Sequence, residues 1–162
     1  QTVREGWLYT GDIGVVDEDG YLRITDRKKD IIVNSGGDNI APQRVEGMLT
    51  LRPEIAQAMV VGDRRPYLVG VIVPRQEFLE GFAKQHGYKP DLKALADDPD
   101  LHRALLTAIE KVNTGLSVIE RVRRFVIASE PFSIDNGMMT PSMKVRRHVV
   151  RQAYGEKLEK LY

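Results

Sequence analysis

The sequence has no cysteine among its 162 residues. Disulfide bonds, thiolate metal sites and a cysteine nucleophile are therefore excluded, and the composition fits a reducing compartment. Long apolar runs are missing as well. One of the longest, residues 68–73, is far shorter than the roughly 20 residues with which a helix crosses a bilayer. We therefore expect no transmembrane segment.

An excess of either charge is also absent, because 24 lysines and arginines face 23 aspartates and glutamates, for a net charge of +1. This balance gives no overall field that would recruit nucleic acid or an acidic membrane. The three histidines, His86, His102 and His148, lack the spacing of metal ligands, so we predict no protein metal site. A chain of this length buries roughly 70% of its unfolded surface and needs no disulfide or metal for support.

The first residues contain strand signals but no methionine, and we expect the chain to be a piece of a longer protein. Two short apolar runs, 15–16 and 21–24, flank the turn residues 17–20, which predicts a hairpin. The wholly polar stretch 25–30 follows. We interpret it as an exposed connector and a domain boundary.

The remaining residues predict an α+β domain, in which a central three-stranded sheet is flanked by helices and preceded by β-hairpins. A second hairpin is expected around the glycine-rich tip 34–39. Near-continuous apolar runs predict buried strands at 55–61, 67–73 and 124–128. Helical spacing of apolar residues predicts helices from Pro42 onward, at 76–85, at 99–116 and at 144–161.

The last predicted helix is amphipathic. The residues expected on its buried side are Val145, Val149, Ala153, Leu158 and Leu161. Its basic residues, which we interpret as a solvated face, are Arg146, Arg147, His148 and Arg151. A nucleic-acid surface needs clustered cations interleaved with stacking aromatic rings, and this helix does not combine them in that way.

Three clusters are rich in glycine or charged residues, which are unfavourable in a hydrophobic core. They are 9–14, 26–39 and 136–147. Each cluster alone is typical of a turn, a hairpin tip or a basic helix. In this order they resemble the C-terminal part of the adenylate-forming superfamily, which includes acyl-CoA synthetases, peptide-synthetase adenylation domains and firefly-type luciferases. The matching segments are 7–12 for the ribose motif, 17–22 for the next hairpin, 26–30 for the hinge and 140–144 for the catalytic-lysine motif.

Within the superfamily, the chain most resembles the long-chain fatty acid–CoA ligases. The long helical insertion at about 76–116 and the segment 131–133 before the lysine motif carry this resemblance. An aryl or medium-chain acid–CoA ligase is the alternative, and the acyl pocket that distinguishes them lies outside these residues. Two alternative interpretations assign the chain to other functional classes. It would be a non-catalytic binding module, or a nucleic-acid-binding domain that uses the basic last helix.

The resemblance implies roles for residues near the expected domain boundary. Asp12 would accept hydrogen bonds from the two ribose hydroxyls of ATP, and the guanidinium of Arg27 would join it there. Lys29 would be the hinge, where a few residues absorb a large change of backbone angles. Residues 1–26 would then belong to the large domain, 27–29 to the hinge and 30–162 to the mobile small domain.

The other two implied sites lie in the small domain. Ser35, Gly36 and Gly37 would line the tunnel for the pantetheine arm of CoA, since glycine lets the backbone approach a ligand closely. Lys144 would be catalytic. A compact ammonium between a carboxylate and the α-phosphate of ATP offsets their repulsion and stabilises charge in the transition state.

The implied reaction has two steps. A fatty acid and ATP, with Mg²⁺ on its phosphates, give acyl-AMP and pyrophosphate, and CoA then displaces AMP. The fatty acid, ATP and CoA would bind through the large domain. Its phosphate loop, adenine pocket and acyl tunnel have no match here, so we expect the isolated chain to be inactive. The parent enzyme is expected to be cytoplasmic, with peripheral membrane contact open to it.

Overall fold

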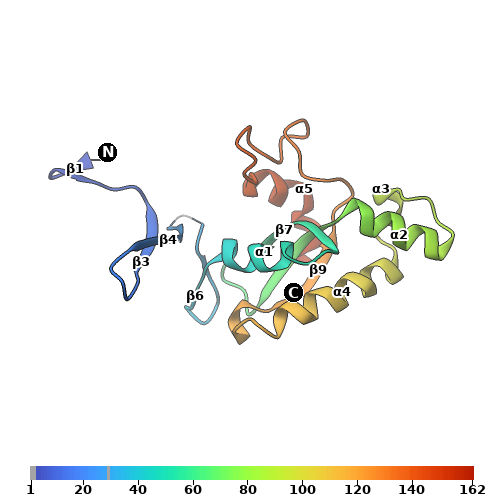
Figure 1. The fold of residues 1–162 in the computed structure, drawn as a ribbon, viewed down its shortest axis with the longest axis horizontal. Helices are drawn as coiled ribbons and strands as arrows, with labels where there is room; N and C mark the ends of the chain where they lie inside the picture. Colours follow the sequence, from blue (N-terminus) through green and yellow to red (C-terminus); the bar gives the residue numbers. More distant parts are fainter. Residues whose placement is uncertain (1–2, 29) are drawn as a thin grey trace.

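The computed structural model describes residues 3–28 and 30–162 (Figure 1). The helices are α1 (Pro42–Thr50), α2 (Gln76–His86), α3 (Leu92–Leu95), α4 (Pro99–Asn113) and α5 (Arg147–Glu159), with a 3-10 turn, η1, at Val118–Glu120. The strands are β1 (Val3–Arg4), β2 (Trp7–Leu8), β3 (Asp12–Val16), β4 (Leu22–Arg27), β5 (Ile32–Val33), β6 (Asn39–Ile40), β7 (Ile55–Val61), β8 (Leu68–Pro74) and β9 (Val122–Ile127). Two-stranded hairpins thus precede a three-stranded sheet, and the predicted α+β class is confirmed.

Strand β8 is the centre of the sheet, and every one of its residues is buried. It pairs with β7 antiparallel and with β9 parallel. Leu68 and Ile72 belong to one hydrophobic core, whereas Val69, Val71 and Val73 belong to a second. Both faces of the sheet are therefore covered, as the continuous apolar runs predict.

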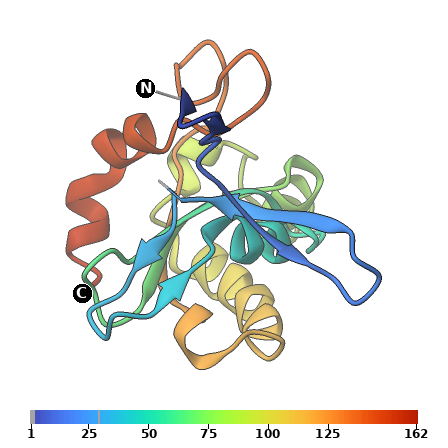
Figure 2. The same cartoon turned by 90° about the vertical axis from the view of Figure 1, so that its left-hand side faces the viewer.

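Different helices cover the two faces of the sheet (Figure 2). Helices α1, α2 and α4 contribute to the first core. The apolar residues Leu101, Leu105 and Ile109, which recur at helical spacing along α4, are fully buried. Helix α5 and residues of the loop before it make up the second core with β8. The parallel pairing of β8 with β9 needs a long crossover, and α2 to α4 lie within it.

Local signals explain where several helices begin and end. Pro42 occupies the first turn of α1, as predicted, where its missing N–H costs nothing. The Asp98 carboxylate accepts the N–H groups of Asp100 and Leu101 and so caps α4. Helix α2 ends at Gly87, whose φ of 71° is left-handed and suits glycine. Helix α3 was not predicted, because four residues are too few to show a helical period.

The β3–β4 hairpin is longer than its apolar residues predict. Pairing runs from Asp12 opposite Arg27 to Val16 opposite Leu22, with a bulge between Ile13 and Gly14. The interpretation of 25–30 as a connector is therefore wrong for 25–27, which continue β4. The reason is that ladder hydrogen bonds use the backbone, so polar residues extend a strand whose partner is in place.

The last helix differs from its prediction at both its start and its buried face. It begins at Arg147 rather than Lys144, and its buried residues are Val150, Tyr154 and Leu158, whereas Ala153 is exposed. Neighbouring apolar residues at 149 and 150 leave the helical phase ambiguous in sequence, and packing on β8 selects the latter. Within the described ranges, no helix is both long enough and apolar enough to cross a membrane.

Candidate functional site

The loop that presents Lys144 is itself a small hairpin. Met139 and Val145 form an antiparallel bridge at its base. The Thr140 N–H donates to the Lys144 carbonyl at 2.8 Å, and the Lys144 N–H donates to the Thr140 hydroxyl at 3.1 Å. Met143 at the tip adopts a φ of 60°, and the Lys144 side chain is exposed. The lysine thus projects from a hydrogen-bonded loop, which makes it available to an anionic ligand.

The chain that leads into this loop is anchored to the sheet. The side-chain amide of Gln57 on β7 donates to the Phe132 carbonyl at 2.9 Å and accepts the Phe132 N–H at 2.8 Å. Asn136 then accepts the N–H groups of Ser133 and Met138, at 3.0 and 3.1 Å. Side-chain amides therefore replace missing backbone partners along this irregular segment.

The chain that leaves the loop is anchored through Arg147. Its guanidinium donates to Glu46 of α1 at 2.5 Å and also to the backbone carbonyl of Val60 on β7. The interpretation of Arg147 as part of a solvated face is therefore wrong. A residue 101 positions away supplies the partner, so no local pattern reveals the contact.

The glycine-rich loop lies between β5 and β6. The Asn34 side-chain oxygen accepts the N–H groups of Gly36 and Asp38, each at 2.9 Å, and so organises the tip. Gly37 has a φ of 86°, which L side chains rarely adopt. The Ser35 N–H donates to the Arg65 carbonyl at 3.0 Å, so the loop rests on the turn between β7 and β8. Ser35, Gly36 and Gly37 are all exposed.

The predicted ribose and hinge residues lie in the N-terminal part of the chain. Asp12 is exposed at the start of β3, and its N–H donates to the Thr10 hydroxyl at 3.1 Å. The backbone of Arg27 pairs with that of Asp12 across the hairpin. The structure does not describe the side chain of Arg27, and Lys29 lies outside the described residues. Asp12, the glycine-rich loop and Lys144 are thus on three separate elements.

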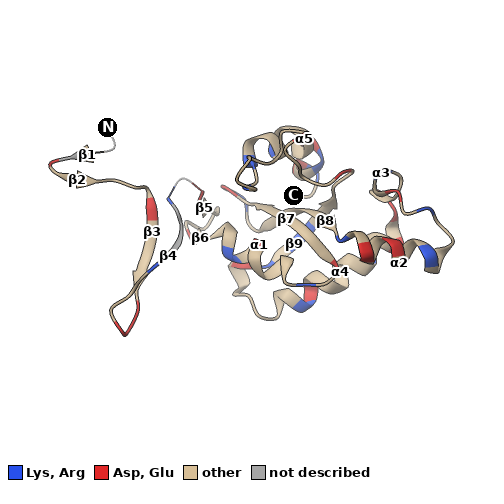
Figure 3. Cartoon of the chain, turned by 45° about the horizontal axis from the view of Figure 1, so that its top comes forward, with Lys and Arg blue, Asp and Glu red and all other residues tan. Residues whose placement is uncertain are grey.

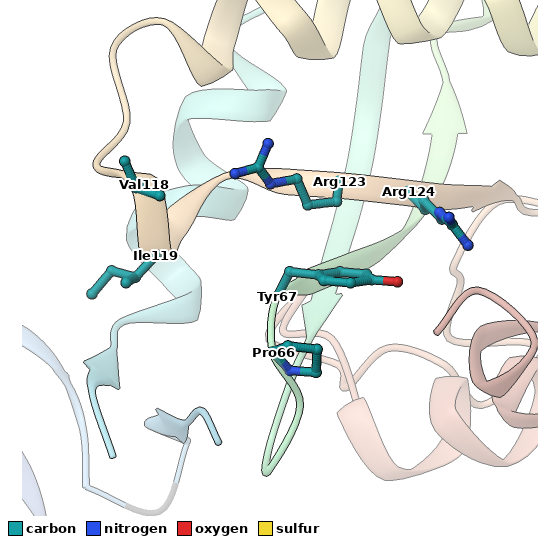
Figure 4. A pocket seen from close by; sticks show the side chains of 6 residues that line it. All are labelled: Pro66, Tyr67, Val118, Ile119, Arg123 and Arg124. Atoms are coloured by element: carbon teal, nitrogen blue, oxygen red, sulfur yellow. The ribbon is translucent and has the colours of Figure 1, made fainter. Parts of the chain in front are cut away.

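A pocket that the sequence analysis did not single out lies beside the β7–β8 turn, with a volume of about 500 Å³. Pro66 and Tyr67 line one side, and Val118, Ile119, Arg123 and Arg124 line the other. Figure 4 shows the Tyr67 ring and the side chains of Arg123 and Arg124 around this opening. A lining that combines apolar side chains with two arginines suits a ligand that joins an anionic group to an apolar one.

Charge and ionisation elsewhere show two further features. Basic and acidic segments are interspersed over the helices, a distribution that does not favour a nucleic-acid interface (Figure 3). Burial raises the pKa of Tyr162, whose ring lies under the guanidinium of Arg65, to about 12. The described residues contain no group of three or more His, Asp or Glu side chains that could hold a metal ion.

Comparison with protein families shows which family the chain belongs to. Residues 29–162 match the family described as the AMP-binding enzyme C-terminal domain. The chain belongs to this family. The match covers the β5–β6 hairpin, the three-stranded sheet and the Lys144 loop.

Curated relatives of this domain include long-chain fatty acid–CoA ligases. FadD15 of Mycobacterium tuberculosis is 41% identical over 160 residues, which cover 98% of this chain and 27% of that protein. Ligase 5 of Rattus norvegicus is 36% identical over 162 residues, which cover 98% of this chain and 24% of the rat protein. The chain thus spans about a quarter of the length of these relatives.

Solved structures with a similar fold include adenylation domains of carboxylate reductases. The domain from Mycobacterium chelonae has a TM-score of 0.81 and 29% identity, and it matches 99% of this chain and 24% of its own. The domain from Segniliparus rugosus, solved with AMP and a co-purified carboxylic acid, has a TM-score of 0.82 and 29% identity over the same shares.

Proposed function

We propose that this domain is the C-terminal part of a long-chain fatty acid–CoA ligase. The parent enzyme joins a fatty acid to AMP at the expense of ATP, releases pyrophosphate, and then transfers the acyl group to the thiol of CoA. Mg²⁺ enters with ATP, whose phosphates it bridges. The identity of the curated relatives over nearly the whole chain supports this assignment.

The observation that carries the proposal is the loop that projects Lys144. Attack of a carboxylate on the α-phosphate brings two anions together, and an ammonium held at that point stabilises the charge that develops. The mutual hydrogen bonds of Thr140 and Lys144 orient the lysine backbone before any substrate arrives. Preorganisation of this kind is what makes one cation effective in the transition state.

We assign the second step to the glycine-rich loop. Ser35, Gly36 and Gly37 present backbone without large side chains, which lets the narrow pantetheine arm of CoA pass close to the chain. The neighbouring pocket with Arg123 and Arg124 offers cations to the phosphates of CoA. In this proposal Asp12 and Arg27 hold the ribose, and rotation about Lys29 exchanges the Lys144 loop for the glycine-rich loop.

The exposed apolar residues near the N-terminus support a boundary in this region. Trp7 is 75% exposed, and Leu8, Val16 and Leu22 are also exposed. Exposed large apolar residues on both N-terminal hairpins are consistent with another part of the parent protein packing there. We propose that residues 1–26 complete the large domain, 27–29 form the hinge and 30–162 form the mobile domain.

The test uses the full-length enzyme that contains this chain. Lys144→Ala should abolish pyrophosphate release from a long-chain fatty acid and ATP, yet still convert supplied acyl-AMP to acyl-CoA. An equal fall in both steps would contradict the role of Lys144. The substrate class is tested by comparing the activity of the enzyme on aryl, medium-chain and long-chain acids. A preference for aryl or medium-chain acids would replace the assignment as a long-chain ligase.

The same experiment includes the isolated chain. We expect it to release no pyrophosphate, because the phosphate loop, adenine pocket and acyl tunnel of the superfamily have no match in its sequence. We place the parent enzyme in the cytoplasm, with peripheral membrane contact open to it. Release of pyrophosphate by the purified fragment would contradict this division of labour.

A further inference from the structure

The side chains of Arg147 and Glu46 both form hydrogen bonds with the backbone of Val60 on strand β7. Oε1 of Glu46 accepts the Val60 N–H at 2.8 Å and the Arg147 guanidinium at 2.5 Å. The other terminal nitrogen of Arg147 donates to the Val60 carbonyl. One residue of the strand is thus bonded through both of its backbone groups to side chains from α1 and α5.

This contact lies at an edge of the sheet. The strand order β7-β8-β9 leaves one side of β7 without a partner strand, where backbone groups need other partners. The side chains of Arg147 and Glu46 are only 22% and 15% exposed. By comparison, those of Lys157 and Asp97, an ion pair that also involves α5, are 49% and 86% exposed. Shielded, charge-assisted hydrogen bonds contribute more than exposed ion pairs do.

The start of α5 lacks the usual features that stabilise a helix N-terminus. Arg146 at the N-cap position accepts no hydrogen bond with its side chain, and the first turn contains no acidic residue. Instead Arg146 and Arg147 place positive charge at the positive end of the helix dipole, which is unfavourable. The carboxylate of Glu46 supplies the missing negative charge from another element.

We propose that Glu46 and Arg147 form a positioning pair for Lys144, an inference that rests on the proposed function. Arg147 follows Lys144 by three residues, so its attachment to β7 determines where the Lys144 loop ends. Gln57, on the same strand, holds the segment that enters the loop through Phe132. Because both ends of the Lys144 loop are attached to β7, the Lys144 ammonium keeps its orientation relative to the sheet while the domain rotates.

The pair also joins the two sites of the small domain. Glu46 lies on α1, which directly follows the hairpin that carries the glycine-rich loop. The contact with Arg147 therefore connects the element after that loop with the element after Lys144. We expect the two loops to rotate as one rigid body, which a swing between two steps requires.

The test measures the two half-reactions separately in the full-length enzyme. Arg147→Met removes the donors but retains an apolar stem. A displacement of the loop by about 1 Å should lower the pyrophosphate-forming kcat by roughly 10- to 100-fold with little change in the KM for ATP. Conversion of supplied acyl-AMP to acyl-CoA should change by less than about twofold. Lys157→Met, which removes an exposed ion pair from the same helix, is the matched control and should leave both steps unchanged.

Glu46→Gln is the milder variant, because its amide oxygen still accepts the Val60 N–H. It should lower the same step by a smaller factor. The double variant should be no slower than Arg147→Met alone, because both residues act through one contact. Arg147→Lys should be only partly active, since a single ammonium does not reproduce the fork between two acceptors.

An unchanged pyrophosphate-forming step in folded Arg147→Met enzyme overturns the proposal, as does an equal loss of both steps in Glu46→Gln. Should Arg147→Met fail to fold, Glu46→Gln decides alone. These outcomes are separate from the test of the proposed function, which depends on Lys144→Ala in enzyme with an intact Glu46–Arg147 pair.

Discussion

Thr140 and Lys144 are hydrogen-bonded to each other in both directions. The Thr140 backbone N–H donates to the Lys144 carbonyl at 2.8 Å, and the Lys144 N–H donates to the Thr140 side-chain hydroxyl at 3.1 Å. The Ser142 hydroxyl lies 3.0 Å from the same Thr140 oxygen. The backbone of the lysine therefore depends on one side chain four residues earlier.

Thr140→Val tests this dependence, because it keeps the shape of the side chain and removes its hydroxyl. The Lys144 N–H loses its acceptor, so we expect the folded state to lose about 1 kcal/mol. The pyrophosphate-forming step in the full-length enzyme should fall roughly tenfold as the loop loosens. Single-turnover kinetics measures the step, and Thr140→Ser, which keeps the hydroxyl, should behave like the original enzyme. Full activity in Thr140→Val would mean that the backbone bonds alone hold the loop.

Gly37→Ala tests the left-handed backbone of the glycine-rich loop. A Cβ at this position meets no atom within 4 Å, so the cost comes from its φ of 86° rather than from a clash. We expect a loss of about 1–2 kcal/mol in the free energy of unfolding, measured by urea titration. The acyl-AMP to acyl-CoA step should fall while pyrophosphate release is retained.

Gly47→Ala is the matched control for that substitution. Gly47 lies inside α1, where a Cβ also meets no atom within 4 Å. Because alanine favours a helix, this variant should gain about 0.5–1 kcal/mol. Equal effects of the two substitutions would show that the backbone at Gly37 carries no strain for alanine.

Tyr162 gives a prediction in alkaline solution. Burial raises its pKa from 10.0 to about 12, and its hydroxyl donates to the Val61 carbonyl at 3.3 Å. Since the neutral phenol is favoured by folding, its contribution to stability is complete below pH 10 and is lost as the pH rises toward 12. The phenolate absorbance of the chain should show a step near pH 12 that Tyr162→Phe removes. Persistence of that step in the variant would assign it to another group.

Some features of the site were accessible from sequence because they are local. Asn34, Gly36 and Gly37 indicate a tight hairpin tip, and the structure has one there. Residues 25–27 were wrongly interpreted as part of a connector, because their polarity conceals the backbone pairing that extends β4 to Arg27. Gln57 was missed for a related reason. A polar residue inside a buried strand has no evident partner until Phe132 is brought beside it.

The sequence by itself determined the composition of the cores, the approximate positions of the three sheet strands and the turns between them. It did so because continuous apolar runs, glycine and proline act on their own neighbourhood. The tertiary structure decided that Lys144 stays in a loop, that α5 begins at Arg147, and that Val150 rather than Val149 is fully buried. The burial of Val150 depends on packing against β8, and the position of Arg147 depends on Glu46 and Val60. All of these residues are distant in sequence and meet only when α1, the sheet and α5 have packed.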